Sequence, residues 1–513
     1  MRFPRLADLE PVLTRRGVIA YWLISATLFG LARITASSTL SYDEARSVEM
    51  AQELAGGYTL RQPPLYDQLG WLLAQALGPG AASQLALRFA LVALIGWLAF
   101  LAVERASGSE RFAAAGSLLL SLHSYFGWSF HHWGTHTLVL CAAALGSFVA
   151  LVDLAARPGL GRAVLFGLAL GSGLMSKFSF PLFLGGLFIS GLSIPELRRV
   201  LCSRWMVVAA LVAAALCAPY LAWLATVQGD VVTVVRAHMI PGAQSHLARA
   251  AIGLGRLGWS LCEFMAPWLA ALALLMPRAI DPRAKRGRAP GMAERLARRT
   301  TGVAIALAAL GIVATGATTV ADHYMPPLLI LAPIILFGRA AALEGTAPQL
   351  PRIASAALVA TLALTLYRAT LPTIDALLGR PPNTGYLPYG ALAREMAARG
   401  YDRGTAVAAD VREAGNLRAV LPQLRVIATG NSHRTLRPPH RDGTRDRCFA
   451  VWRLLGRGPE GNLETVAAPT LPRGLEMAAR EATVIEVAAA PLFVHRRVRW
   501  AVLDLTQDSS KCR

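Results

Sequence analysis

Two adjacent carboxylates, Asp43 and Glu44, directly follow the first long apolar stretch of the chain, in the string Ser41-Tyr-Asp-Glu-Ala-Arg46. A carboxylate that is partly removed from water at a bilayer surface can act as a general base, so Asp43 could take a proton from an attacking hydroxyl or amine. A structural role also fits, because Ser41 and Glu44 have the spacing of a helix-capping box and Arg46 could pair with Asp43.

Cations and aromatic residues lie at the ends of other apolar stretches. Arg61 and Tyr66 flank a Gln-Pro-Pro-Leu segment, and Lys177, one of only three lysines, ends an apolar run. A fixed cation at such a place could hold a phosphate group. A lysine at the end of a span is also a common anchor that reaches to water, and the Pro-Pro pair alone indicates no more than the end of a helix.

The composition predicts a polytopic helical membrane protein. Of 513 residues 54% are hydrophobic and 16% are charged, and the mean hydropathy is +0.45. Apolar runs of membrane-spanning length predict about eleven spans; they cover residues 17–35, 86–103, 112–130, 135–153, 163–176, 178–194, 206–226, 257–277, 300–319, 324–338 and 353–371. The first run has the length of a full span, which favours an uncleaved anchor over a cleaved signal.

The net charge of +20 does not predict nucleic-acid binding, because the arginines gather in short loops between spans. These loops precede residue 17, separate the second from the third and the sixth from the seventh span, and fill residues 277–300, so the positive-inside rule places them in the cytoplasm. Loop 36–85 is then external. An odd number of spans places the C-terminal region outside as well, and a bacterial inner membrane is the expected location.

The chain changes character after residue 372, which predicts two domains: a membrane domain over residues 1–372 and a small periplasmic α/β domain over residues 373–513. Short buried strands are expected at 404–410, 424–429, 482–488 and 500–505, and a helix at 389–399. Cys448 and Cys512 fall in this region. An oxidising compartment would allow them to form a disulfide, although the sequence does not show that they approach each other.

Three motifs in this order resemble a known family: Tyr42-Asp-Glu-Ala45, Gln62-Pro-Pro-Leu-Tyr66 and the glycine-rich run 167–178 that contains Lys177. They are similar to motifs of the integral membrane glycosyltransferases of the GT-C fold, family 39, which includes protein O-mannosyltransferases and aminoarabinose transferases. The resemblance covers about residues 15–340. His323 and Tyr324, before Pro326-Pro327, resemble the stretch before a late span of these enzymes.

The resemblance implies that a sugar moves, with inversion, from a polyprenyl-phosphate carrier in the membrane lipid to an acceptor on the outer face. Asp43 matches the catalytic aspartate and Glu44 its acidic neighbour. Lys177 and Arg61 would hold the lipid phosphate, because fixed cations stabilise the charge of a leaving phosphate. Tyr66, Tyr324, His136 and His323 would contribute to substrate binding. The C-terminal domain could select the acceptor, which is a lipid, a protein or a polysaccharide, or cover the site.

One segment departs from the family pattern. Relatives often carry an acidic residue near residues 128–136, whereas this chain has His131, His132 and His136 there. His136 could stand where that acid would be, so no cofactor is certain. A divalent metal such as zinc could bind His132 and His136 on a helix, but clustered Trp and His also form interfacial belts. Two rival functions stay open: a transporter or flippase of a lipid-linked solute, and a non-catalytic scaffold for envelope assembly.

Overall fold

The computed structural model describes residues 6–131, 133–227, 231–240, 245–378, 385–429, 438, 447–454, 482–488 and 497–506. The chain forms two compact units. Unit 1 comprises residues 1–28, 60–65 and 88–364, and unit 2 comprises residues 29–59, 66–87 and 365–513. Unit 2 therefore combines the segment that carries Asp43 with the C-terminal region.

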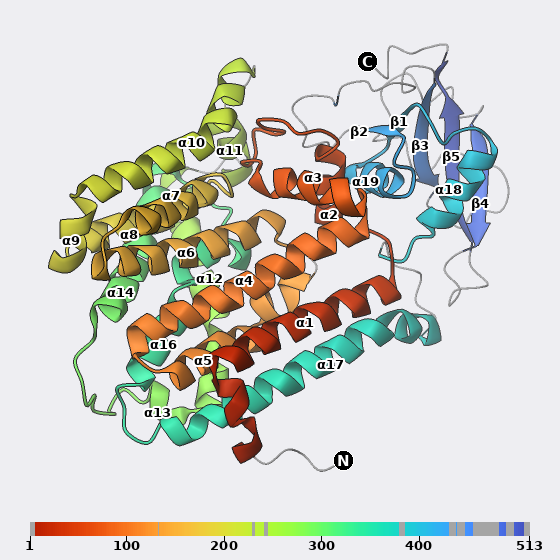
Figure 1. The fold of residues 1–513 in the computed structure, drawn as a ribbon. Helices are drawn as coiled ribbons and strands as arrows, with labels where there is room; N and C mark the ends of the chain where they lie inside the picture. Colours follow the sequence, from red (N-terminus) through yellow and green to blue (C-terminus); the bar gives the residue numbers. More distant parts are fainter. Residues whose placement is uncertain are drawn as a thin grey trace. The chain divides into compact units, whose positions relative to one another are not determined.

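Helices make up nearly all of the first 377 residues that the structure describes (Figure 1). The α-helices are α1 (Arg15–Ala36), α2 (Tyr42–Met50), α3 (Leu65–Leu77), α4 (Ala81–Ser107), α5 (Glu110–Leu118), α6 (Thr135–Ala156), α7 (Leu160–Leu174), α8 (Phe180–Leu192), α9 (Pro195–Leu201), α10 (Arg204–Thr226), α11 (Val231–Met239), α12 (His246–Leu275), α13 (Pro277–Ile280), α14 (Met292–Thr315), α15 (Pro326–Leu329), α16 (Ala332–Ala340) and α17 (Leu350–Leu377). Short 3-10 or π segments are η1 (Leu6–Leu13), η2 (Leu119–Leu122), η3 (Ser124–Trp128), η4 (Ser129–His131), η5 (Asp322–Tyr324) and η6 (Ala347–Gln349).

The protein is a polytopic helical membrane protein, as its hydropathy predicts. Within the described ranges, seven helices are long and apolar enough to cross a membrane, and α8 with α9, bent by 114°, would make an eighth. The seven are α1, α4, α6, α10, α12, α14 and the helix over residues 347–377; α7 and residues 326–340 are shorter apolar helices. This count is lower than the predicted eleven spans.

Two of the predicted spans are interrupted, which explains much of the difference. The predicted span at 112–130 is divided into α5, η2, η3 and η4. The side chain of His123 accepts a hydrogen bond from the backbone amide of Tyr125 at 2.9 Å and begins the π-helical η3. At this point a side chain, and not a helical carbonyl group, accepts the hydrogen bond of the backbone amide. Hydropathy alone cannot reveal such a break in a helix. The predicted span at 324–338 is divided among η5, α15 and α16.

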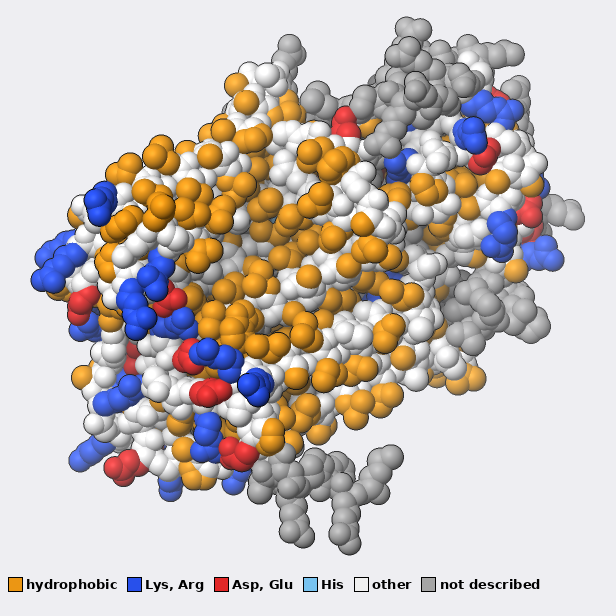
Figure 2. Space-filling view, in the orientation of Figure 1, with side chains coloured by type: hydrophobic (Ala, Val, Ile, Leu, Met, Phe, Trp, Pro, Cys, Tyr) orange, Lys and Arg blue, Asp and Glu red, His pale blue; other side chains and the backbone are white. Residues whose placement is uncertain are grey.

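The basic loops that were predicted to share one side of the membrane meet at one end of unit 1. Arg288 donates to the backbone oxygen of Ser107 at 2.7 Å, and Arg295 pairs with Glu196 at 3.1 Å. In Figure 2, Lys and Arg side chains gather where α5, α9 and α13 lie, whereas hydrophobic side chains dominate the surface of α10 and the middle of α4. The contacts confirm that these loops lie on the same side.

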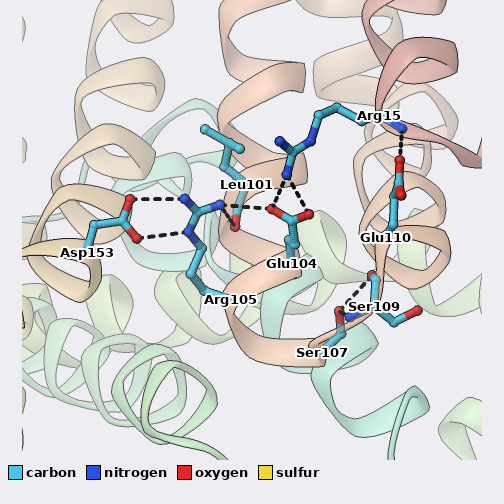
Figure 3. A network of polar contacts seen from close by, with 8 residues as sticks. All are labelled: Arg15, Leu101, Glu104, Arg105, Ser107, Ser109, Glu110 and Asp153. Atoms are coloured by element: carbon cyan, nitrogen blue, oxygen red, sulfur yellow. Dashed lines mark hydrogen bonds and ion pairs between the residues drawn. The ribbon is translucent and has the colours of Figure 1, made fainter. Parts of the chain in front are cut away.

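An ion-pair network joins four helices at this end (Figure 3). Arg15, at the start of α1, donates to Glu104 at 2.8 Å through its guanidinium and to Glu110 at 2.5 Å through its backbone amide. Glu104 also accepts from Arg105 at 3.0 Å, and Arg105 forms a two-pronged pair with Asp153, with both contacts at 3.0 Å. The network ties the starts of α1 and α5 to the ends of α4 and α6.

The C-terminal part of unit 2 is a mixed sheet with helices. The strands are β1 (Thr405–Ala408), β2 (Arg425–Ala428), β3 (Cys448–Leu454), β4 (Thr483–Ala488) and β5 (Arg497–Asp504), and the helices are α18 (Tyr389–Ala398) and α19 (Val411–Val420). The strand order is β2-β1-β3-β5-β4, with β1 parallel to β2 and β3, and β5 antiparallel to β3 and β4. The four predicted strands and the predicted helix are confirmed, whereas β3 and α19 were not predicted.

Burial explains why this sheet forms. All residues of β1 and β2 are buried, as expected of parallel strands with both faces covered. Leu417 of α19, Val426 of β2 and Trp500 of β5 belong to one buried apolar cluster. Cys448 at the start of β3 is disulfide-bonded. Its predicted partner, Cys512, lies outside the described residues.

Candidate functional site

Asp43 and Glu44 lie in the first turn of α2, within unit 2. Ser41 is the N-cap residue, and its backbone amide donates to Oε2 of Glu44 at 2.8 Å. The capping box predicted for this segment is thus confirmed, and Glu44 is almost fully buried. Asp43 is half-buried and precedes the capping carboxylate by one residue. Both acids lie in the first turn of α2, at the positive end of the helix dipole.

A buried arginine, which sequence reasoning did not single out, closes the loop before α2. The guanidinium of Arg33, near the end of α1, donates to the backbone oxygens of Ser37 and Thr39 and lies 3.5 Å from Oε2 of Glu44. Arg33 therefore fixes the loop and neutralises the capping carboxylate at the same time. An arginine inside the first apolar run was the signal that could have revealed it, because a charge in such a run requires partners.

Lys177, Tyr324 and His323 come together in unit 1, although about 145 residues separate Lys177 from the other two. Lys177 follows α7, and its Nζ donates to Oγ1 of Thr137 at 3.1 Å and lies 5.3 Å from the centre of the Tyr324 ring. The rings of His323 and Tyr324 are 4.1 Å apart. Burial raises the pKa of the Tyr324 hydroxyl, so the phenol remains a neutral hydrogen-bond donor. The cluster offers one ammonium group, one phenol and one imidazole to an anion.

The Gln-Pro-Pro-Leu motif also reaches this part of unit 1. The backbone amide of Leu65 donates to the backbone oxygen of Met175 at 3.1 Å, two residues before Lys177. Two motifs that carried the family resemblance are therefore in direct contact. Arg61, four residues before Leu65, is exposed, and Tyr66, which belongs to unit 2, is fully buried.

His136 lies in the first turn of α6, directly before the Thr137 that binds Lys177, and it is almost fully buried. Arg88, fully buried in α4, donates to the backbone oxygens of Phe130 and Trp133 at 3.1 and 3.4 Å. Arg88 was not predicted from the sequence. It holds the segment that leads into α6 and so helps to fix the position of His136.

The described residues include no group of three or more His, Cys, Asp or Glu side chains that could hold a metal ion. His132, the other half of the predicted zinc pair, lies outside the described residues. The groups that the structure does show are acids in the first turn of α2 and a lysine with aromatic neighbours after α7. These are groups for proton transfer and for binding an anion.

Comparison with known proteins supports a glycosyltransferase. Residues 61–223 match the family model described as dolichyl-phosphate-mannose-protein mannosyltransferase. The lipopolysaccharide core galacturonosyltransferase RgtA of Rhizobium johnstonii is 28% identical over 80% of this chain and 80% of its own length. RgtB of the same organism, with the same description, is 26% identical over 92% of this chain and 94% of its own length.

A solved structure has the same fold. The crystal structure of ArnT from Cupriavidus metallidurans bound to undecaprenyl phosphate superimposes with a TM-score of 0.58 at 13% sequence identity, over 94% of this chain and 97% of that protein. The apo state of the same protein gives a TM-score of 0.57. The fold match includes nearly all of the chain and therefore extends to the C-terminal region. The chain thus has the fold of ArnT, and its residues 61–223 are similar to the mannosyltransferase family.

Proposed function

We propose that this enzyme transfers a sugar from a polyprenyl-phosphate carrier to an acceptor on the outer face of a bacterial inner membrane, with inversion at the anomeric carbon. The observation that supports this most is the likeness to RgtA and RgtB, which extends over 80% and 92% of the chain. The ArnT structure of the same fold contains undecaprenyl phosphate, a carrier of this type.

The two relatives also suggest the sugar and the acceptor. Both are described as lipopolysaccharide core galacturonosyltransferases. We therefore assign galacturonic acid as the sugar to test first and a hydroxyl group of the lipopolysaccharide core as its acceptor.

In the proposed reaction the oxygen of the acceptor hydroxyl attacks the anomeric carbon. The bond between that carbon and the phosphate oxygen breaks, and polyprenyl phosphate leaves with the electron pair. Asp43 accepts the proton of the hydroxyl, and Glu44 and Arg33 hold the helix turn in place. Lys177 stabilises the charge that develops on the phosphate, with Arg61 as a second cation. Tyr66, Tyr324, His136 and His323 are proposed to bind substrate.

Contacts within unit 2 support an external C-terminal domain. The backbone amide of Leu40, in the first loop, donates to Oδ1 of Asn416 in α19 at 2.8 Å. Residues that share a hydrogen bond lie on the same side of a membrane, so the first loop and the C-terminal domain lie together whatever the number of spans. The basic loops at the other end of α1 predict that this side is the outer one.

The test is sugar transfer by purified enzyme in proteoliposomes, with undecaprenyl-phosphate galacturonic acid as donor and lipopolysaccharide core as acceptor. Asp43→Asn keeps the size of the side chain and removes the base, so transfer should fall by about 100-fold or more. Asp153→Asn is the matched control. Asp153 belongs to the ion-pair network at the basic end of unit 1 (Figure 3) and has no part in the proposed reaction. Its transfer rate should stay near that of the wild type.

Transfer by the wild type and its loss in Asp43→Asn would support a transferase that uses Asp43 as base. Equal transfer by both proteins would reduce Asp43 to a residue of the helix cap. No transfer by the wild type, with several lipid-linked sugars and acceptors, would instead favour the transporter or the envelope scaffold.

A further inference from the structure

Helix α19 of the C-terminal domain packs directly against α2, the helix that carries Asp43. Gly415 of α19 lies so close to the backbone of Ala45 that a Cβ atom at position 415 would overlap the carbonyl group of Ala45. Leu40, Ala45 and Val48 form a buried apolar cluster with Ala419 of α19. Glycine is needed at position 415 because the two backbones approach each other too closely for any side chain.

Two buried amide side chains fix both ends of the segment that contains α2. Asn416 accepts a hydrogen bond from the backbone amide of Leu40 at 2.8 Å and donates one to its backbone oxygen at 3.3 Å. Gln52 makes the same pair of contacts with Val426, accepting from its amide and donating to its oxygen, both at 2.9 Å. Val426 belongs to β2, which lies at an edge of the sheet. The side chain of Gln52 therefore makes the backbone hydrogen bonds that a further strand would make at this edge.

A third contact lies beside the proposed base itself. The guanidinium carbon of Arg412, in the first turn of α19, is 5.8 Å from the centre of the Tyr42 ring, and Tyr42 directly precedes Asp43. Residues on both sides of Asp43 in the sequence therefore contact α19 or β2. They are Leu40 and Tyr42 before it, and Ala45 and Gln52 after it. Asn416 and Gln52 are both almost fully buried, and buried hydrogen bonds of this kind are costly to break.

We propose that α19 and β2 of the C-terminal domain are a positioning element for Asp43, with Gly415, Asn416 and Gln52 as its positioning residues. This inference rests on the proposed function. It assigns to the C-terminal domain a part in the chemical step, in addition to any part in selecting the acceptor. A small displacement of a general base lowers the rate of the chemical step, because proton transfer requires hydrogen-bond geometry between the base and the hydroxyl.

The experiment compares two glycine variants in the full-length enzyme. Gly415→Ala adds one methyl group that must push α19 away from α2, and we expect kcat to fall at least about tenfold while the donor KM stays within about twofold. Gly390→Ala is the matched control, because position 390 lies on α18 of the same domain and a Cβ there meets nothing within 4 Å. Its kcat and KM should match those of the wild type.

A second variant guards against loss of folding. Asn416→Leu keeps the branched shape of the side chain and removes both hydrogen bonds to Leu40. It should lower kcat in the same way, with the elution profile in detergent and the affinity for undecaprenyl phosphate kept. A purely structural role would lower the yield of folded protein and leave kcat per folded molecule unchanged.

The outcomes separate this inference from the proposed function. If the wild type transfers sugar and both Gly415→Ala and Asn416→Leu keep the wild-type kcat, the positioning role is wrong and the transferase stands. If the donor KM rises in both variants while kcat is unchanged, α19 serves substrate binding and the inference is again wrong. If the wild type itself transfers no sugar, the proposed function has failed first.

Discussion

At the scale of single residues, Lys177 shows which features of the candidate site can be predicted from the sequence and which cannot. The rarity of lysine and its place after an apolar run predicted a phosphate-binding cation, with a membrane anchor as the alternative. The structure shows Nζ bound to Thr137 and near the Tyr324 ring. Neither partner could be found by local spacing, because Thr137 lies in α6 and Tyr324 in η5, far along the chain. The capping box was predictable because all of its atoms lie within four residues.

We expect Lys177→Gln to lower kcat/KM by about 100-fold, since it removes a charge that would stabilise the leaving phosphate. Thr137→Val, which removes only the hydrogen bond to Nζ, should have a smaller effect. Lys285→Gln is the control, because Lys285 is exposed in the basic loop after α13. The measurement is the initial rate of transfer at several donor concentrations. Wild-type kinetics in Lys177→Gln would leave this lysine as a membrane anchor.

At the scale of elements, the strands of the C-terminal domain were predictable from short runs of buried residues between turn signals. Strand β3 was missed, because a basic proline-containing stretch precedes it and its pairing with β1 comes from distant sequence. Helix α19 was missed because it is only weakly amphipathic; its Gly415 and Asn416 have low helix propensity and are there for contacts with the first loop. The break in the predicted span 112–130 depended on one histidine side chain. In each case long-range or side-chain contacts decided the element.

The same helix carries a buried acid that makes the stability of unit 2 depend on pH. Glu413 accepts a hydrogen bond from Nε1 of Trp500 at 3.1 Å. Burial, with a smaller contribution from the Asp410 carboxylate, raises the pKa of Glu413 from 4.5 to about 7, and Arg453 opposes the rise. Burial also raises the pKa of the neighbouring Tyr389 hydroxyl, which stays neutral.

Between pH 4.5 and 7 native Glu413 holds a proton that the unfolded chain has released, so the free energy of unfolding falls as the pH rises through this range. Above pH 7 the contribution is constant. We expect the Tm of the wild type to fall from pH 5 to pH 8 by more than that of Glu413→Gln, which keeps an acceptor for Trp500 and cannot ionise. Glu395→Gln, at an exposed site on α18, should keep the wild-type pH dependence. Parallel Tm profiles for Glu413→Gln and the wild type would contradict this assignment.

At the scale of the whole molecule, hydropathy predicted a polytopic membrane protein and the charge pattern predicted its two sides. The predicted number of spans, about eleven, exceeds the seven or eight found among the described residues, because hydropathy also counts broken and short apolar helices. The contact of Leu40 with Asn416 makes the side of the C-terminal domain independent of that number. The contact between Arg288 and Ser107 does the same for the basic loops. Tertiary contacts therefore show which loops and domains share a side of the membrane, which a count of spans does not.

The topology can be tested with cysteines that the chain already has. Cys202, between α9 and α10, is exposed at the basic end, and Cys262 is the other exposed free cysteine among the described residues; Cys141 and Cys217 are buried and Cys448 is disulfide-bonded. In a Cys262→Ser background, Gly390→Cys adds one exposed thiol on α18. A membrane-impermeant maleimide applied to intact spheroplasts should label position 390 and leave Cys202 unlabelled until the membrane is permeabilised, because the positive-inside rule places Cys202 in the cytoplasm. Labelling of Cys202 but not of position 390 in intact spheroplasts would show the opposite orientation in the membrane. Asp43 would then have to act on a cytoplasmic acceptor.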